Sequence, residues 1–277
     1  MNRSKLFLLT VLFLGISLFS CSTNENQAQN SELKNIEVDS LTINDTTRLS
    51  VSTLKSYPIK VRGYYEFPKA DSTNEWSNRL AKLYTDVILE KNDSDGIKSA
   101  IQLFNADIIK IVSNQFSDTL EIADESRQQK PQQINIRITQ VYNNNSIACF
   151  CKDIFYTTKD DNAIISKSYF TFDIANSKQI SIDDIFQTAR IDELKDLLQK
   201  KLIEREHVTE TNDLIDMGYF NIENMNIQNF YLTKDGITFV FEPYEIACYA
   251  LGEISIELSF SELAPLLTEN SILSDLY

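Results

Sequence analysis

FYLTKDGITFVFEPYEIACYALGEISIELSFSELAPLL, residues 230–267, is the stretch that decides the fold. Asp235-Gly236 lies between two runs of β-branched and aromatic residues, 229–233 and 237–241. Asp-Gly in this setting is the strongest short-range signal for a β-hairpin. Beyond the hairpin, the same stretch predicts an irregular loop, one more strand and a short closing helix.

The irregular loop is enclosed by Pro243 and Gly252, and it has neither strand nor helix periodicity. Its two tyrosines either contact a ligand or pack at a corner between strands, with their hydroxyls bonded to the backbone. Its two glutamates are the pair to test for acid–base chemistry, although their separation depends on the tertiary structure. The candidate ligand-binding residues are Glu242, Tyr244, Glu245 and Tyr249.

Upstream, apolar residues alternate along several strand-like runs and recur at helical spacing along three others. Pro58 indicates that the first of these strands lies near a sheet edge. Residues 91–96 resemble a calcium loop, but Lys91 and Gln102 stand where its first and last ligands belong, so we predict a turn between helices. The predicted strands are 57–67, 134–142, 146–157 and 164–174, and the predicted helices are 75–90, 97–116 and 191–206.

This order of elements lacks alternating βαβ units and therefore predicts the α+β class. We expect a mainly antiparallel sheet packed with two or three amphipathic helices, then the C-terminal hairpin and a short closing helix. With 43% hydrophobic residues, the chain has enough apolar side chains for a sizeable core.

The N-terminus has the pattern of a signal peptide over residues 1–20. Arg3 and Lys5 precede an apolar run, 6–19, that is too short for a comfortable membrane span. Leu18-Phe19-Ser20-Cys21 resembles the lipobox of bacterial lipoproteins, in which the cysteine receives the lipid. We expect acyl chains on Cys21 to hold the protein at the membrane, each methylene contributing about 0.8 kcal/mol. The expected location is the cell envelope, at the outer membrane, on its periplasmic or its surface face.

Three segments follow this leader. Residues 21–56 are rich in Ser, Thr, Asn and acids and predict a flexible tether, with at most a strand near its end. Residues 57–186 and 187–277 carry the predicted helices and strands, and we expect these two regions to form one compact unit.

Acidic side chains dominate the chain, with 40 acidic against 26 basic residues and a formal net charge of −14. Such a surface repels phosphate backbones, and the sequence has no basic stripe with interleaved aromatics, so we expect no nucleic-acid partner. The acidity serves either solubility or the binding of a cationic protein or peptide.

His207 is the only histidine, and its charged surroundings predict an exposed helix end. A single histidine excludes two-histidine metal sites. The sequence contains no GxSxG, GxxxxGK[ST] or GxGxxG pattern, so we expect no serine-hydrolase elbow, no nucleotide and no cofactor.

The cysteines other than Cys21 leave several alternatives open. Cys149 and Cys151 are two residues apart in a strand-like run and would share one face. Cys248 either pairs with one of them in an oxidising envelope, or all three are small buried hydrophobic residues. A zinc site built from the three would need a fourth ligand.

Two sets of motifs resemble known families. The C-terminal stretch contains Asp235-Gly236, Phe241, Pro243-Tyr244-Glu245-Ile246, Tyr249-Ala250, Gly252 and Ser261-Glu262-Leu263, a combination that resembles the DUF3298 family, also called RsiV-like. Upstream, residues 60–186, with Phe172-Asp173 and Ser181-Ile182-Asp183-Asp184-Ile185-Phe186, are similar to the companion DUF4163 (PdaC-type) domain. The Gly-Gly-Ala-His of that domain is replaced here by Asp160-Asp161-Asn162-Ala163.

The resemblance implies an extracytoplasmic module that occurs in a lysozyme-sensing anti-sigma factor, in a peptidoglycan deacetylase and in stand-alone lipoproteins. The sequence has neither the spanning helix of the first nor the histidine-containing catalytic domain of the second. We therefore expect a lipid-anchored, non-enzymatic recognition module that binds a protein, such as a cationic lysozyme-like one, or a cell-wall ligand such as peptidoglycan. The alternatives are a carboxylate-dependent hydrolase of envelope glycans and a structural subunit of an envelope complex.

Overall fold

The computed structural model describes residues 36–50, 56–71, 73–92, 95–117, 132–144, 146–157, 163–269 and 271–273. Residues 34–277 form one compact unit by their contacts. The predicted signal peptide, the lipobox cysteine and residues 160–162 lie outside the described residues. Within the described ranges, none of the helices combines the length and the apolar character that crossing a membrane requires.

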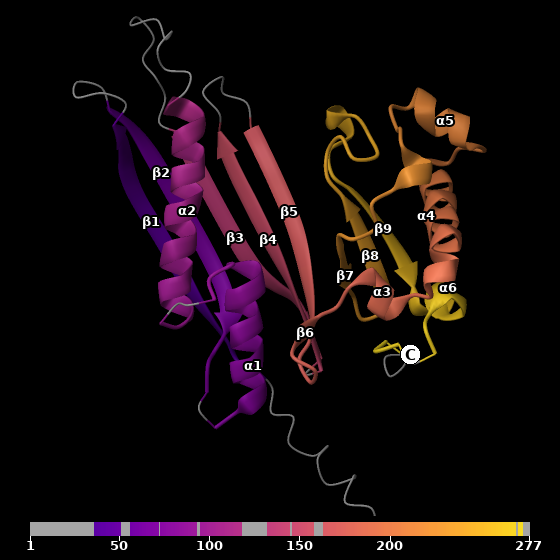
Figure 1. Cartoon of the computed structure of the whole chain (residues 1–277). Coiled ribbons are helices and arrows are strands. Elements are labelled where there is room, and N and C mark those ends of the chain that lie inside the picture. Colours follow the sequence, from indigo (N-terminus) through magenta and orange to yellow (C-terminus); the bar gives the residue numbers. More distant parts are fainter. Residues whose placement is uncertain are drawn as a thin grey trace, which may run out of the picture. The chain divides into compact units, whose positions relative to one another are not determined.

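Six strands form the larger sheet, in the spatial order β1-β2-β3-β4-β5-β6 (Figure 1). Neighbouring strands are antiparallel except β2 and β3, which are parallel because two helices cross over between them. The predicted α+β class with mainly antiparallel pairing is confirmed, whereas this one crossover was not expected. The strands are β1 Val38–Ser50, β2 Ser56–Pro68, β3 Gln132–Asn143, β4 Ile147–Thr157, β5 Ala163–Asp173 and β6 Lys178–Gln179.

The first strand is longer than the sequence indicated. Residues 38–50, within the segment 21–56 for which at most a strand near its end was expected, pair with β2 along their whole length, from Val38 opposite Pro68 to Ser50 opposite Ser56. β1 is therefore the outer strand, and Pro58 lies in the strand next to it, near the sheet edge as predicted. Its position near the start of β2 explains how a residue without an N–H is tolerated there.

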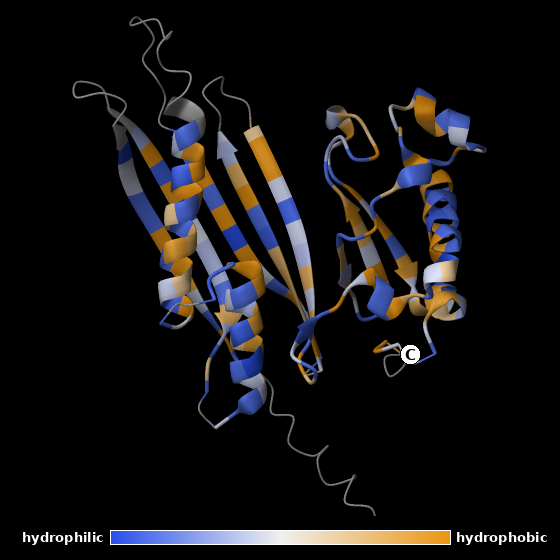
Figure 2. Ribbon diagram, in the orientation of Figure 1, coloured by the Kyte–Doolittle hydropathy of each residue, from blue (hydrophilic) through white to orange (hydrophobic). Residues whose placement is uncertain are grey.

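Helices α1 (Glu75–Leu83), its π-helical continuation η2 (Tyr84–Ile88) and α2 (Ile97–Ser117) cover one face of this sheet (Figure 1). Apolar and polar residues alternate along the strands in Figure 2. Because alternate side chains point to opposite faces of a sheet, one set packs with the helices in a shared core. At the centre of this core, the rings of Tyr84 and Phe150 meet edge to face, with their centroids 5.3 Å apart. The ring of Phe172 lies next to Phe150, with a centroid separation of 6.4 Å.

A second sheet of three antiparallel strands has the order β7-β8-β9. Its strands lie within residues 230–267, and the hairpin predicted there at Asp235-Gly236 is confirmed. Helix α4 packs on it through Leu194, Leu198 and Leu202, and it ends at the exposed His207, which has a left-handed φ of 58°. The strands are β7 Phe230–Leu232, β8 Gly236–Phe241 and β9 Ile254–Ser259. The helices are α3 Ile182–Ile185, α4 Ile191–Glu206, α5 Thr211–Asp216 and α6 Phe260–Leu263, with 3-10 turns η4 Thr188–Arg190, η5 Ile222–Asn224, η6 Tyr249–Leu251 and η7 Ala264–Leu266.

Gly236 is required by space rather than by its backbone angle. Its φ is not positive, so the turn is not the mirror-image type that an Asp-Gly pair usually indicates. The hydroxyl of Thr233 instead accepts the N–H groups of Asp235 and Gly236 and closes the turn. A Cβ on Gly236 would lie 2.0 Å from the carbonyl oxygen of Leu258 on β9.

We therefore expect Gly236→Ala to lower the free energy of unfolding by about 1–3 kcal/mol, because backbone atoms of β8 and β9 must move apart. Urea denaturation measures the loss. Lys234→Ala is the control in the same turn, since Lys234 is exposed and its substitution brings no backbone atoms closer together. Equal losses in the two variants would contradict the crowding argument.

The closing helix α6 is fixed by Glu262. Its carboxylate accepts hydrogen bonds from the N–H and the hydroxyl of Ser259 at 2.9 and 2.7 Å, and its own backbone N–H donates to the Ser259 hydroxyl oxygen at 3.4 Å, so the two backbone N–H bonds form a capping box. The same carboxylate pairs with Lys201 of α4 at 2.6 Å. The Lys201 ammonium, followed by the Ser259 donors, lowers the pKa of Glu262 to about 2.

A carboxyl whose pKa is lower in the folded than in the unfolded chain stabilises the fold above the unfolded pKa and loses that effect as pH falls. We expect Glu262→Gln to reduce the free energy of unfolding at pH 7 by about 1–2 kcal/mol, with the deficit shrinking as pH falls from the ordinary pKa of 4.5 toward 2. Urea titrations at stepped pH test this. Glu269→Gln, at an exposed position, should show no such pH-dependent deficit, and a constant deficit for Glu262→Gln would refute the linkage.

Candidate functional site

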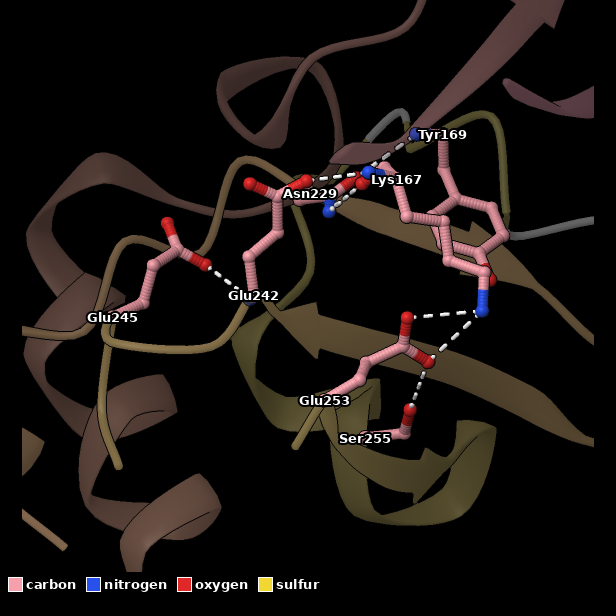
Figure 3. A network of polar contacts seen from close by, with 7 residues as sticks. All are labelled: Lys167, Tyr169, Asn229, Glu242, Glu245, Glu253 and Ser255. Carbon is pink, nitrogen blue, oxygen red and sulfur yellow. Dashed lines mark hydrogen bonds and ion pairs between the residues drawn. The ribbon is translucent and has the colours of Figure 1, made fainter. Parts of the chain in front are cut away.

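Side chains from segments next to the second sheet form hydrogen bonds with the free edge of β5. Asn229 accepts the N–H of Tyr169 and donates its amide to the carbonyl of Lys167, both at 2.9 Å (Figure 3). The backbone carbonyl of Asn229 accepts the N–H of Val240 at 2.9 Å. One side-chain amide thus replaces the neighbouring strand that β5 lacks at this point.

Glu242, which directly follows β8, completes this edge network. Its carboxylate accepts the backbone N–H of Lys167, and its own N–H donates to Glu245 Oε2 at 2.7 Å (Figure 3). Burial raises the pKa of Glu245, and the N–H of Glu242 opposes that rise. Both candidate glutamates therefore hold the backbone of the loop in place.

Glu253 approaches the same edge from the far end of the loop. Its two carboxylate oxygens lie 3.1 and 2.9 Å from the ammonium of Lys167 (Figure 3). Glu242 and Glu253 line a hollow of about 290 Å³ together with Ile165, Pro243 and Tyr249. The loop is thereby tied to β5 at both of its ends.

Tyr244 and Tyr249 point outward from this loop. Tyr244 is 67% and Tyr249 49% exposed, and their rings stack on each other with centroids 5.7 Å apart. Neither hydroxyl bonds to another described residue. The packed-corner alternative, with the hydroxyls bonded to backbone, does not hold here.

Tyr244 also carries backbone strain. Its φ is 74°, in the left-handed region that tyrosine rarely adopts, and its N–H donates to the carbonyl of Ala247 at 3.0 Å. Conformations of this kind cost of order 1–3 kcal/mol and persist where surrounding contacts enforce them. The bonds of Glu242 and Glu245 are the contacts that enforce this one.

Further exposed apolar side chains lie in or next to a segment whose backbone pairs with the loop, and sequence reasoning missed them. Residues 218–220 pair with the loop, because Cys248 donates its N–H to Gly218 and Phe220 donates its N–H to Ile246, each at 2.9 Å. The chain reversal after α5 brings them there, and no local pattern in the sequence indicated it. We call the following set the tyrosine-loop surface: Met217, Phe220, Tyr244, Tyr249 and Leu251.

The three described cysteines are free thiols, so the alternative in which Cys248 pairs with Cys149 or Cys151 does not hold in this structure. Burial raises the pKa of the Cys149 thiol to about 11, and its sulfur lies 3.3 Å from the hydroxyl of Thr171. Among the described residues, His, Cys, Asp and Glu side chains form no group of three that could hold a metal ion. Cys149 and Cys151 match the alternative of small buried hydrophobic residues.

Comparison with known proteins finds a family match within the C-terminal part of the chain. Residues 183–261 match the model of DUF3298, a family described as of unknown function, and this confirms the resemblance found in the sequence. The structure of a DUF3298 family member from Bacteroides fragilis NCTC 9343 is similar, with a TM-score of 0.75 and 21% identity over 87% of this chain and 97% of that chain. A DUF3298 family protein from Pseudomonas aeruginosa PAO1 gives a TM-score of 0.53 and 10% identity over 86% and 96%. At these identities the likeness is one of fold, and among curated proteins none matches the chain.

The edge network predicts the effect of removing the Asn229 amide. We expect Asn229→Ala to lower the free energy of unfolding by about 1–3 kcal/mol, because the Tyr169 N–H and the Lys167 carbonyl lose their partner. Denaturation measures the loss, and hydrogen exchange at Tyr169 should accelerate. Asn212→Ala, at an exposed position of α5, is the control. Unchanged exchange at Tyr169 would show that the edge does not depend on this side chain.

Proposed function

We propose that this protein, whose residues 183–261 form a DUF3298 domain, is a non-enzymatic recognition module that binds a cationic protein through its tyrosine-loop surface. The observation that carries the proposal is the stacked, exposed pair of Tyr244 and Tyr249, held outward by a strained backbone and a network of hydrogen bonds.

Tyrosine is well suited to this role. Its ring offers a large apolar area with few rotatable bonds, and tyrosines are enriched among the residues that dominate binding energies at protein interfaces. Stacking further restricts the two rings before a partner arrives, so less entropy is lost on binding. Met217, Phe220 and Leu251 are also exposed and lie in the loop or next to the segment that pairs with it, and exposed apolar side chains of this kind mark interaction sites.

Charge selects the class of partner. Residues 208–253, which supply the tyrosine-loop surface, contain eight acidic residues and one lysine, and Asp216 and Glu223 are exposed close in sequence to the apolar side chains. A basic protein with an exposed apolar group would be attracted and correctly oriented by such a rim. A lysozyme-like protein has the required charge, and peptidoglycan is the cell-wall ligand to compare with it.

The proposal includes the setting of the domain. We propose that Cys21 carries a lipid that anchors the protein in the cell envelope, at the outer membrane, and that residues 57–186 are a DUF4163-type region. The lipobox-like sequence and the motifs at 172–173 and 181–186 support these statements. A lipid anchor would display the tyrosine-loop surface to partners in the envelope.

The carboxylate-dependent hydrolase gains no support from the loop. Glu242 and Glu245 both accept backbone N–H groups, and Glu253 pairs with Lys167. A general acid or base must direct its carboxyl group toward the substrate, whereas these three carboxyl groups are directed toward backbone N–H groups and the Lys167 ammonium. These contacts explain the three glutamates as supports of the loop.

Binding by the full-length protein in detergent tests the proposal. We expect immobilised protein to retain lysozyme at low salt and to release it as salt is raised, while lysozyme made anionic by succinylation is not retained. Tyr249→Ala and Tyr244→Gly should each weaken binding at least about tenfold, the effect of losing a central aromatic contact. Tyr244→Gly should leave stability unchanged or raised, because glycine accepts the left-handed backbone.

Ile111→Ala is the matched control, because Ile111 of α2 is 51% exposed and lies outside the tyrosine-loop surface. Sedimentation with peptidoglycan is measured in parallel, and binding there with loss in the same tyrosine variants would transfer the function to a cell-wall ligand. Retention of neither probe at low salt would remove the motivation for the proposal.

A further inference from the structure

The larger sheet has a second face that the helices do not cover. Side chains of β2 and β3 alternate, so Ile59, Val61, Ile134 and Ile136 pack against α1 and α2, while the intervening residues point the other way. On that other face, a hollow of about 460 Å³ opens over strands β1 to β4. It shares no residue with the tyrosine-loop surface.

Strand register brings the charged side chains of this hollow together. Arg62 pairs with Asn135 and Tyr64 pairs with Arg137 across the parallel β2 and β3. The two arginines are therefore on adjacent strands, offset by two residues, and point to the same face of the sheet. Their Cα atoms are then about 8 Å apart by strand spacing and rise, close enough for both long side chains to reach one group. Asp153 of β4 lies opposite Arg137.

Arg62 and Arg137 have no hydrogen bond or ion pair with any described residue. By contrast, Arg79, Arg190 and Arg205 each pair with a glutamate. In a chain with 40 acids and 26 bases, two neighbouring arginines that form no ion pair are unexpected from charge alone. Among the residues that line the hollow, these two arginines outnumber the single acid Asp153, so the hollow is locally positive on an acidic protein.

The acids nearest to the arginines form no ion pair with them. Glu66 is occupied, because its two oxygens accept the Tyr64 hydroxyl at 3.0 Å and the N–H of Gln140 at 2.9 Å. Asp153 lines the hollow yet forms no ion pair within the described part of the chain, although it faces Arg137 of β3 and Lys167 of β5 in register. The hollow therefore offers five-donor guanidinium groups and a free carboxylate acceptor side by side.

We propose that this hollow binds a saccharide that carries a carboxylate. The planar guanidinium groups of Arg62 and Arg137 hold the carboxylate through paired N–H donors. Asp153 accepts sugar hydroxyls, which both donate and accept, and the amide of Asn135 bonds to others. The ring of Phe155 packs on the apolar face of a sugar.

The free carboxylate of Asp153 argues for a sugar acid over an acidic peptide. A run of glutamate or aspartate side chains has no donor for Asp153 other than its backbone and repels it, whereas a sugar ring supplies hydroxyl donors beside its single carboxylate. Amide side chains in the hollow, Asn44 and Asn135, suit the same mixture of donors and acceptors.

Calorimetric titration of the full-length protein with a galacturonate trimer tests the proposal. We expect the trimer to bind and the neutral galactose trimer to bind at least tenfold more weakly. Arg62→Ala and Arg137→Ala should each weaken binding of the galacturonate trimer at least tenfold with unchanged melting temperature, because both side chains are exposed. Lys60→Ala is the control on the same face of β2, and it should change binding less than threefold.

Asp153→Asn separates the two ligand classes. For a sugar acid it should weaken binding, because an acceptor for hydroxyls is altered, while a glutamate hexapeptide should bind more tightly to it. Tyr249→Ala should leave trimer binding unchanged, which keeps this site distinct from the tyrosine-loop surface. No binding of the galacturonate trimer at millimolar concentration, insensitivity to both arginine variants, or tighter binding of the glutamate hexapeptide than of the trimer would overturn the proposal.

Discussion

The exposed edge of β5 is the constraint on which the arrangement of the C-terminal half depends. β6 pairs with β5 only at Phe172 and Asp173, so the rest of the strand has backbone groups without a neighbouring strand. An open edge of this kind invites pairing with other chains. Asn229 and Glu242 occupy it with side-chain hydrogen bonds, and both belong to segments next to the second sheet.

The same bonds fix the loop that carries the exposed tyrosines. Glu242 is bonded to β5 and to Glu245, and Glu253 is bonded to Lys167, so the loop is held at both ends while its rings stay exposed. The strained φ of Tyr244 is maintained by this surrounding set of bonds. Protection of a sheet edge and presentation of an aromatic pair are thus two results of one network.

Much of the fold was predictable because its signals are local. The hairpin at Asp235-Gly236, the apolar stripes of α2 and α4 and the alternation in β3 to β5 each follow from neighbouring residues. The full extent of β1 was not predictable, since its Asp and Asn residues have weak strand propensity and its order comes from pairing with β2 over 13 residues. Asp235-Gly236 correctly predicted the hairpin, but glycine is needed there because the backbone of β9 approaches closely and not because of a positive φ.

The sequence by itself determined the α+β class, the DUF3298 resemblance, the acidic charge and the loop in which the candidate residues lie. Only the tertiary structure decided their roles, because the roles depend on partners distant in sequence. Lys167 converts Glu242 and Glu253 into supports, and the absence of a covering element leaves Tyr244 and Tyr249 exposed among the described residues. The pairing of β2 with β3 brings Arg62 and Arg137 together across a sequence separation that no local pattern spans.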